Sequence, residues 1–336
     1  MLRLLMLVCF LEGTVGKLSP HFLEGCGGWQ HCLDTHIDSE EPLGWFEGWN
    51  STIQPKLDLL LAKSSNLQEE GWAKDHGLLL VIAGDSTMIQ QFQLLSEFVN
   101  QRSDFQPMKG PDAEKRKNYM VTFGAPENAP GSVTFAFYRV FEACMLGPAN
   151  PLLKTAYAHY FGCGMHLLHL IPVQGPPMLS LALESWNSYD KLLETRVRAI
   201  KGVNPKIKQV FCSTHTIDES KYFGDWLDAL KGYERRDPEY LNKCKTEFDV
   251  KLSQNSPLRG DIEQACVNTV FGRRGVELLN KRGLAAMEAA GVPTVPAHTL
   301  VDGQSWATPA GDGRHYPYLV PMELLMFLNT LEGMRS

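Results

Sequence analysis

The sequence lacks the features that mark nucleic-acid-binding and membrane-spanning proteins. Its 336 residues hold 32 Lys and Arg against 38 Asp and Glu, for a net charge of −6, and no basic stripe is visible. Phosphate backbones are bound by clustered Lys and Arg, so we expect no nucleic-acid partner. No apolar run approaches the roughly 20 residues that cross a bilayer, so we expect no transmembrane span. Internal repeats and low-complexity segments are also missing. The length and the composition, 44% hydrophobic and 21% charged residues, fit an ordinary globular protein with one large α/β domain.

The first 16 residues have the pattern of a secretory signal peptide. Arg3 supplies a positive charge, residues 4–11 form a short apolar core, and small residues precede an expected cut ahead of Lys17. A membrane anchor is the alternative, but the apolar core is too short to span a bilayer. We therefore expect a protein that is secreted or lies in the lumen of the secretory pathway. There, Asn50 in the sequon Asn-Ser-Thr, on a turn-like segment, would be glycosylated.

Cysteine usage is consistent with that route. After cleavage seven cysteines remain, and an odd number leaves at least one thiol without an intramolecular partner. Cys26 and Cys32 flank a short Gly-rich segment, and Cys244 and Cys266 bracket a polar one, so each pair is a candidate disulfide. Cys212 lies inside an apolar strand and is interpreted as a buried small hydrophobe.

The most informative segment is an apolar run, residues 78–83, that ends in Gly84-Asp85-Ser86. It predicts a buried strand that breaks at Gly84 and leads into a helix beginning near residue 87. Ser86 then lies at a strand-to-helix turn, where backbone N–H groups can stabilise a developing oxyanion. The alternative is that Ser86 is only a helix N-cap.

Asp312 and His315 lie three residues apart in one turn near the other end of the chain. Ser, His and Asp are the members of a nucleophilic triad, which is defined by roles and not by chain order. The alternative for Asp312 is a turn residue beside Gly313. His215 follows another apolar segment and is interpreted as a polar loop residue.

Strand-like and helix-like segments alternate from residue 77 onward. Expected strands are 78–83, 132–140, 166–173, 207–213 and 292–297, and expected helices are 87–100, 181–200, 274–290 and 320–331. This order predicts a three-layer α/β/α sandwich with a mostly parallel central sheet, whose site lies at the carboxyl ends of the strands. We expect residues 17–70 to be an N-terminal extension or lid and 71–336 to be the catalytic domain. Within it, 101–130 and 218–260 are expected to be turn-rich or irregular insertions.

The chain resembles the SGNH/GDSL hydrolase superfamily, and within it the PC-esterase branch of polysaccharide and sialate O-acetyltransferases and esterases. The resemblance covers roughly residues 78–331 and rests on Gly84-Asp85-Ser86 and Asp312-Gly313-Arg314-His315-Tyr316. It implies an SGNH-like fold with Ser86 as nucleophile, His315 as base and Asp312 as its orienting carboxylate.

The resemblance also suggests an oxyanion hole. Gly164-Met165-His166 is similar to the Gly-x-His block of the branch, so the Gly164 N–H and a side chain of His166 or Arg139 are the expected donors. The usual oxyanion glycine of the superfamily has no clear counterpart, and Gly124 and Gly147 are the alternatives.

The function expected from these features is acyl-ester chemistry without a metal or organic cofactor. His166 and His169 lie near Cys163, but no fourth ligand stands out, so no metal is expected. The resemblance implies an acylated carbohydrate or glycoconjugate, or another small acyl ester, as substrate. Hydrolysis and transfer to a sugar hydroxyl both remain open. The alternative is a non-catalytic secreted domain of the same fold that binds glycan or protein.

Overall fold

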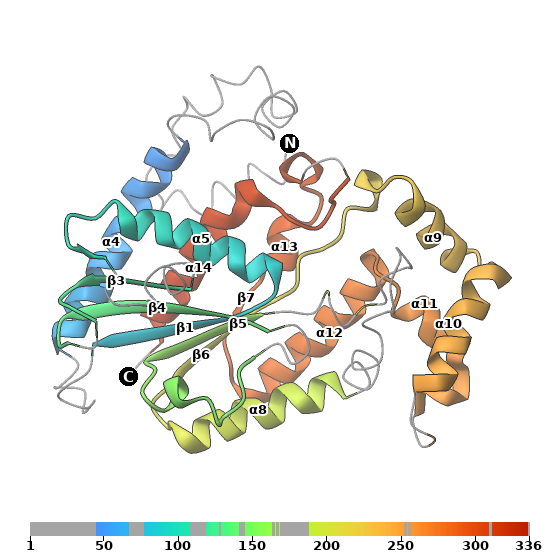
Figure 1. Ribbon diagram of the computed structural model, residues 1–336, viewed down its shortest axis with the longest axis horizontal. Helices are drawn as coiled ribbons and strands as arrows, with labels where there is room; N and C mark the ends of the chain where they lie inside the picture. The colour runs from blue at the N-terminus through green and yellow to red at the C-terminus, as the bar shows by residue number, and fades with distance from the viewer. Residues whose placement is uncertain are drawn as a thin grey trace.

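The protein is built around one seven-stranded sheet with helices on both of its faces (Figure 1). The computed structural model describes residues 45–66, 77–107, 119–127, 129–140, 145–162, 165, 168, 188–251, 254, 257–308 and 311–334. The strands are β1 Leu78–Gly84, β2 Phe105–Gln106, β3 Met120–Gly124, β4 Ser132–Arg139, β5 Ala158–Gly162, β6 Lys208–Cys212 and β7 Thr294–Val295. Their order across the sheet is β2-β3-β4-β1-β5-β6-β7.

β1 is central because every residue in it is apolar or glycine and is buried. It pairs in parallel with β4 and β5, and β6 and β7 continue the parallel arrangement, whereas β3 runs antiparallel to both of its neighbours, β2 and β4. The sheet is therefore mostly parallel, as predicted.

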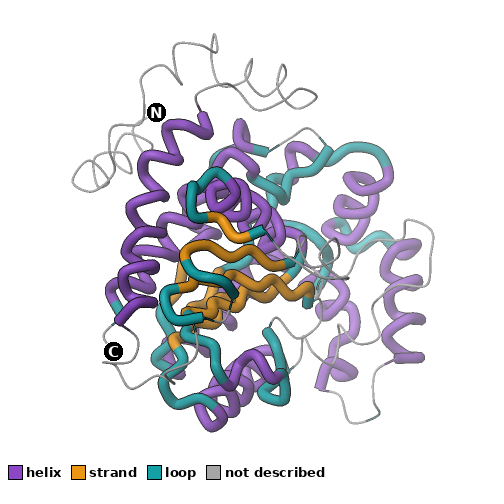
Figure 2. The backbone as a smooth tube through the Cα atoms, turned by 60° about the vertical axis from the view of Figure 1, so that its left-hand side comes forward, coloured by secondary structure: helices purple, strands orange, loops and turns teal. Residues whose placement is uncertain are grey.

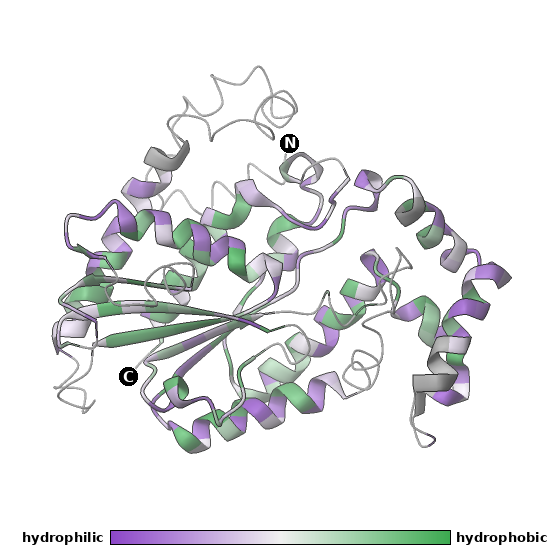
Figure 3. Cartoon of the chain, viewed as in Figure 1, coloured by the Kyte–Doolittle hydropathy of each residue, from purple (hydrophilic) through white to green (hydrophobic). Residues whose placement is uncertain are grey.

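Successive side chains of β1 enter opposite faces of the sheet, as they must in a strand. The helices are α4 Trp45–Asn66, α5 Ser86–Asn100, α8 Tyr189–Val203, α9 Asp225–Glu234, α10 Pro238–Lys251, α11 Ile262–Asn268, α12 Arg273–Ala290, α13 Ala297–Val301 and α14 Val320–Gly333. Leu79, Val81 and Ala83 pack in the core beneath α8 and α12, whereas Leu78, Leu80 and Ile82 pack in the core beneath α4, α5 and α14. Helices flank the strand layer in Figure 2, and the apolar strands lie between amphipathic helices in Figure 3, which confirms the predicted three-layer sandwich.

Several elements differ from the sequence-based expectation. The stretch 101–130 holds β2 and β3, which extend the sheet because Val121 and Phe123 are buried in its core. The stretch 218–260 was expected to be irregular, but it contains α9 and α10. β5 was not predicted, and β7 is only two residues long because Ala297 already begins α13. The expected strand 166–173 lies outside the described residues, apart from residue 168.

The cysteines that the structure describes follow the predictions. A disulfide joins Cys244 in α10 to Cys266 in α11. Cys212 is a buried free thiol at the end of β6. The candidate pair Cys26 and Cys32 lies outside the described residues.

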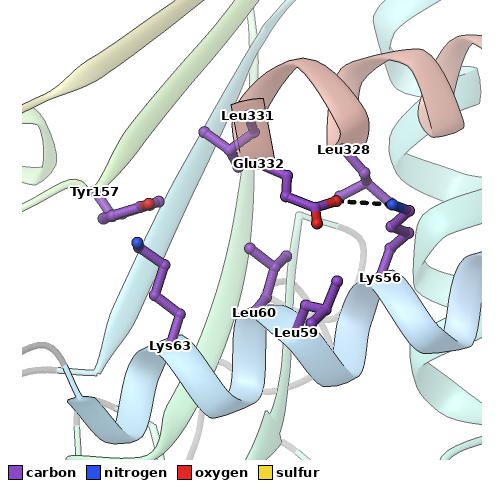
Figure 4. Close-up of a pocket in the computed structure, with 8 residues that line it drawn as sticks. All are labelled: Lys56, Leu59, Leu60, Lys63, Tyr157, Leu328, Leu331 and Glu332. Atoms are coloured by element: carbon purple, nitrogen blue, oxygen red, sulfur yellow. Dashed lines mark hydrogen bonds and ion pairs between the residues drawn. The ribbon is translucent and has the colours of Figure 1, made fainter. Parts of the chain in front are cut away.

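α4 packs directly on the main body of the protein. Ile53 and Leu57 are fully buried in the core shared with β1, α5 and α14. At the seam with α14, Lys56 pairs with Glu332 at 2.7 Å, beside a small cavity of about 180 Å³ (Figure 4). Tyr157 also lines this cavity and precedes β5, so the cavity lies at the amino ends of the parallel strands. None of the described helices is both long and apolar enough to cross a bilayer.

Candidate active site

Ser86 is the first residue of α5, directly beyond the carboxyl end of β1. The helix cap is Asp85, whose Oδ1 accepts hydrogen bonds from the Thr87 N–H at 3.0 Å and the Thr87 hydroxyl at 2.8 Å. The alternative interpretation of Ser86 as the N-cap is therefore wrong. Because Asp85 caps the helix, the Ser86 hydroxyl is left for another partner at the positive end of the helix dipole.

Gly84 allows the strands to approach closely just before this serine. It pairs with Gly162 on β5, and a Cβ on Gly84 would lie 2.1 Å from the Gly162 carbonyl oxygen. No larger residue fits there without moving the backbone, so the tight end of β1 fixes where Ser86 begins the helix.

The structure brings Ser86, His315 and Asp312 into one hydrogen-bonded chain. The His315 Nε2 lies 2.8 Å from the Ser86 Oγ, across a sequence separation of 229 residues. The His315 Nδ1 lies 2.7 Å from the Asp312 Oδ2. A carboxylate can only accept, so the hydrogen-bond network assigns the proton to Nδ1 and leaves Nε2 to accept from the Ser86 hydroxyl.

The other carboxylate oxygen of Asp312 is held by its own turn. Oδ1 accepts from the backbone N–H groups of Arg314 and His315, each at 3.3 Å, and from the Arg314 Nε at 3.0 Å. Burial acts to raise the pKa of Asp312, but the hydrogen bond and charge of His315 and the charge of Arg314 outweigh it. The pKa of Asp312 therefore lies below its ordinary value. The carboxylate is thus ionised at neutral pH and can stabilise a positive charge on His315.

The turn that carries Asp312 and His315 is anchored to the segment after β6. The Gly313 carbonyl accepts from the Asp218 N–H at 2.7 Å, and the Tyr316 hydroxyl donates to the Thr216 carbonyl at 2.7 Å. Gly313 has a φ of 65°, and a Cβ there would lie 2.3 Å from the Asp218 carbonyl oxygen, so this position requires glycine. Sequence reasoning missed this anchoring because residues from 218 onward were interpreted as an insertion.

The residues expected to form the oxyanion hole differ in where they lie and in whether the structure describes them. Arg139 is exposed at the end of β4 and pairs in register with Gly84, so it lies at the same sheet edge as Ser86. Gly164 and His166 lie outside the described residues. Gly124 pairs with Ser132 at the start of β4, so this alternative oxyanion glycine lies at the opposite edge.

Asn50 was expected on a turn-like segment, but it lies in α4, where its Oδ1 accepts from the Gln54 Nε2 at 2.8 Å. Within the described part of the chain, no cluster of three or more His, Cys, Asp and Glu residues has the arrangement of a metal site.

Comparisons with known proteins yield only distant structural likeness. No protein-family model and no curated protein sequence matches the chain. A lipase/acylhydrolase from Enterococcus faecalis has 9% identity and a TM-score of 0.38 over 77% of this chain and 100% of its own. A GDSL-like lipase from Parabacteroides merdae has 11% identity and a TM-score of 0.35 over 77% of this chain and 98% of its own. An extracellular lipase from Streptomyces rimosus has 12% identity and a TM-score of 0.32 over 76% of this chain and 99% of its own. At these identities and TM-scores the likeness carries no argument about activity, which must come from the geometry of the site.

Proposed function

We propose that the protein is a serine acyl-ester hydrolase or O-acyltransferase. The observation that carries the proposal is the continuous chain from the Ser86 hydroxyl through His315 to Asp312, with contacts of 2.8 and 2.7 Å. A turn residue or a helix cap would need no such chain. The non-catalytic alternative gives no reason for the Asp312–His315 turn to meet Ser86, which lies 229 residues before His315, in this order.

The proposed reaction has two stages. The His315 Nε2 takes the Ser86 proton as the Oγ attacks the ester carbonyl, and Asp312 stabilises the imidazolium that forms. Protonation of the leaving alcohol by His315 produces an acyl-Ser86 intermediate. Water then releases the acid, or a sugar hydroxyl takes the acyl group, with His315 again acting as the base. No step in this scheme calls for a metal or organic cofactor.

Several finer points belong to the same proposal. The N-terminal end of α5, the Gly164 N–H and a side chain of His166 or Arg139 would hold the oxyanion. The resemblance of the two sequence blocks to the PC-esterase branch supports an acylated carbohydrate, glycoconjugate or other small acyl ester as substrate. The pattern of residues 1–16 supports secretion after their removal, and the Asn-Ser-Thr sequon supports glycosylation at Asn50.

Replacing the nucleophile tests the proposal. Ser86→Ala should lower the turnover of an aryl acetate by roughly 10⁶-fold and abolish labelling by a fluorophosphonate. It should change the free energy of unfolding by only about 1 kcal/mol, since one hydrogen bond is lost. Ser96→Ala is the matched control, because Ser96 lies in the same helix and bonds only the Phe92 carbonyl in the described structure.

Two outcomes separate the alternatives. Wild-type protein that is folded but neither labelled nor active would favour a non-catalytic binding domain. Labelling that is lost only in Ser86→Ala would support the enzyme. Released acetate and acetylated sugar, measured with and without sugar acceptors, then distinguish a hydrolase from a transferase.

A further inference from the structure

His215 and Glu323 form a buried ion pair next to the catalytic turn, the turn that carries Asp312 and His315. The reaction described above does not use this pair. His215 follows β6 and its side chain is 1% exposed, and Glu323 lies in the first turn of α14 and is fully buried. The His215 Nε2 lies 2.7 Å from the Glu323 Oε1. A pair buried this completely stabilises a fold little more than apolar side chains of similar volume would. Its presence therefore calls for a reason other than stability.

The pair is held rigidly from the α5 side. The Glu323 Oε2 accepts from the Gln91 Nε2 at 2.5 Å, and the Gln91 Oε1 accepts from the Tyr160 hydroxyl at 2.9 Å. Gln91 and Tyr160 are both buried. Both oxygens of the Glu323 carboxylate thus have partners, so its position and orientation are fixed.

The other ring nitrogen of His215 reaches the catalytic turn. Its Nδ1 lies 3.1 Å from the Arg314 carbonyl oxygen, and since a carbonyl only accepts, Nδ1 carries a proton. Burial acts to lower the pKa of His215, but the charge and hydrogen bond of Glu323 outweigh it, so the pKa is raised. Both ring nitrogens face acceptor oxygens, so the geometry favours a doubly protonated ring that donates on one side to Glu323 and on the other to the Arg314 carbonyl.

The peptide group between Arg314 and His315 connects this pair to the proposed catalytic residues. Its carbonyl accepts from His215, and its N–H, which belongs to His315, donates to the Asp312 Oδ1 at 3.3 Å. Hydrogen bonds in series polarise one another in a medium of low dielectric. A positive charge at the carbonyl therefore strengthens the N–H as a donor to Asp312.

We propose that His215 and Glu323 are positioning residues that fix and polarise the Arg314–His315 peptide and so hold Asp312 and His315 in register with Ser86. The inference rests on the proposed function, since it assigns a role toward the same triad. Neither residue needs to touch the substrate, because both act through one backbone peptide.

Uncharged variants test this role, since the buried His215 ring is expected to lose its extra proton once the Glu323 charge that favours it is removed. Glu323→Gln removes the negative charge but keeps one acceptor oxygen for the His215 Nε2, while its amide nitrogen replaces the oxygen that accepts from the Gln91 Nε2. In His215→Leu/Glu323→Gln the donor to the Arg314 carbonyl is lost as well. On 4-nitrophenyl acetate, kcat should fall by about 10-fold in the first variant and about 100-fold in the second, with KM unchanged, because catalytic geometry is lost and not binding.

A matched control separates positioning from loss of stability. Asn204 is also buried and donates to two backbone carbonyls, those of Leu153 and Ala156, but it lies at the opposite end of the strands. Asn204→Leu should lower the melting temperature and leave kcat unchanged. A folded His215→Leu/Glu323→Gln protein with kcat within twofold of wild type would overturn the proposal.

A double-mutant cycle tests the route through Asp312. If the ion pair acts through this carboxylate, Glu323→Gln should change kcat by less than twofold in an Asp312→Asn background. The same loss in both backgrounds would show that the pair does not act through Asp312.

A proton NMR measurement tests the positioning role of His215 and Glu323 even if the protein turns over no ester. The His315 Nδ1–H bonded to Asp312 should give a low-field proton resonance that disappears in Asp312→Asn. In His215→Leu/Glu323→Gln this resonance should shift or broaden, and in Asn204→Leu it should not move. An inactive, unlabelled wild type would refute the proposed function alone, whereas an unmoved resonance would refute the positioning role.

Discussion

His159 on β5 is a buried histidine that should make the stability of the folded protein depend on pH. Its side chain is fully buried and stacks on Phe161, with ring centroids 5.0 Å apart. In the described structure neither ring nitrogen has a hydrogen-bond partner. Burial alone lowers the pKa of His159 to about 3. The folded protein therefore holds this ring in its neutral form at any pH above that value.

This burial predicts a loss of stability in mild acid. Below the ordinary histidine pKa of about 6.5 the unfolded chain takes up a proton at His159 that the folded chain does not. Between about pH 6.5 and 3 the free energy of unfolding should therefore fall by up to about 1.4 kcal/mol per pH unit from this group. His159→Leu should lose less stability than wild type between pH 7 and pH 5 in urea titrations. Equal losses would show that His159 is not buried as a neutral ring.

The proposed catalytic side chains could be named from the sequence because short patterns, each weak alone, stand in an informative context. Ser86 lies between an expected strand and an expected helix, and Asp312 and His315 share one turn before the last expected helix. His215 and Glu323 carry no such signal. Their pairing depends on the end of β6 meeting the start of α14 across 108 residues, which no local pattern encodes.

The disulfide between α10 and α11 should support the stability of these two helices and leave the chemistry untouched. It closes a loop across a sequence separation of 22 residues, for which about 3 kcal/mol of stabilisation is expected from chain entropy. Cys244→Ser/Cys266→Ser should therefore lower the free energy of unfolding by about that amount. Turnover of 4-nitrophenyl acetate at 25 °C should remain at the wild-type level. A lower kcat in the folded double mutant would show that α10 and α11 help to position the proposed catalytic residues.

Strands and helices with clear periodicity were predicted to within a few residues, as for β1, α5, α12 and α14. β5 was missed because it places a polar residue, His159, inside a fully buried strand. β3 lies in a polar stretch and forms a strand because it pairs with β4. Strand propensity depends on such neighbouring strands, so strands near the edge of the sheet are harder to predict from sequence than the central ones.

α4 should be part of the same cooperative unit as the sheet. Leu57 is fully buried between this helix and the main body, so Leu57→Ala should cost about 2–5 kcal/mol of stability. Unfolding should remain a single transition when followed by both circular dichroism and fluorescence. Leu59→Ala is the matched control, since Leu59 lies in the same helix but is 50% exposed, and it should cost far less. A separate early transition in Leu57→Ala would mean that α4 unfolds independently.

The separation of 229 residues between Ser86 and His315 has a consequence for biosynthesis. A ribosome adds about 5–20 residues per second, so the serine leaves the peptidyl-transferase centre on the order of 10 to 50 seconds before the histidine is made. Throughout that interval the nascent chain contains the Ser86 hydroxyl but not His315, its proposed base. The proposed nucleophile is therefore inert during translation and becomes reactive only when the last helix has docked. A prematurely terminated chain would lack that reactivity altogether.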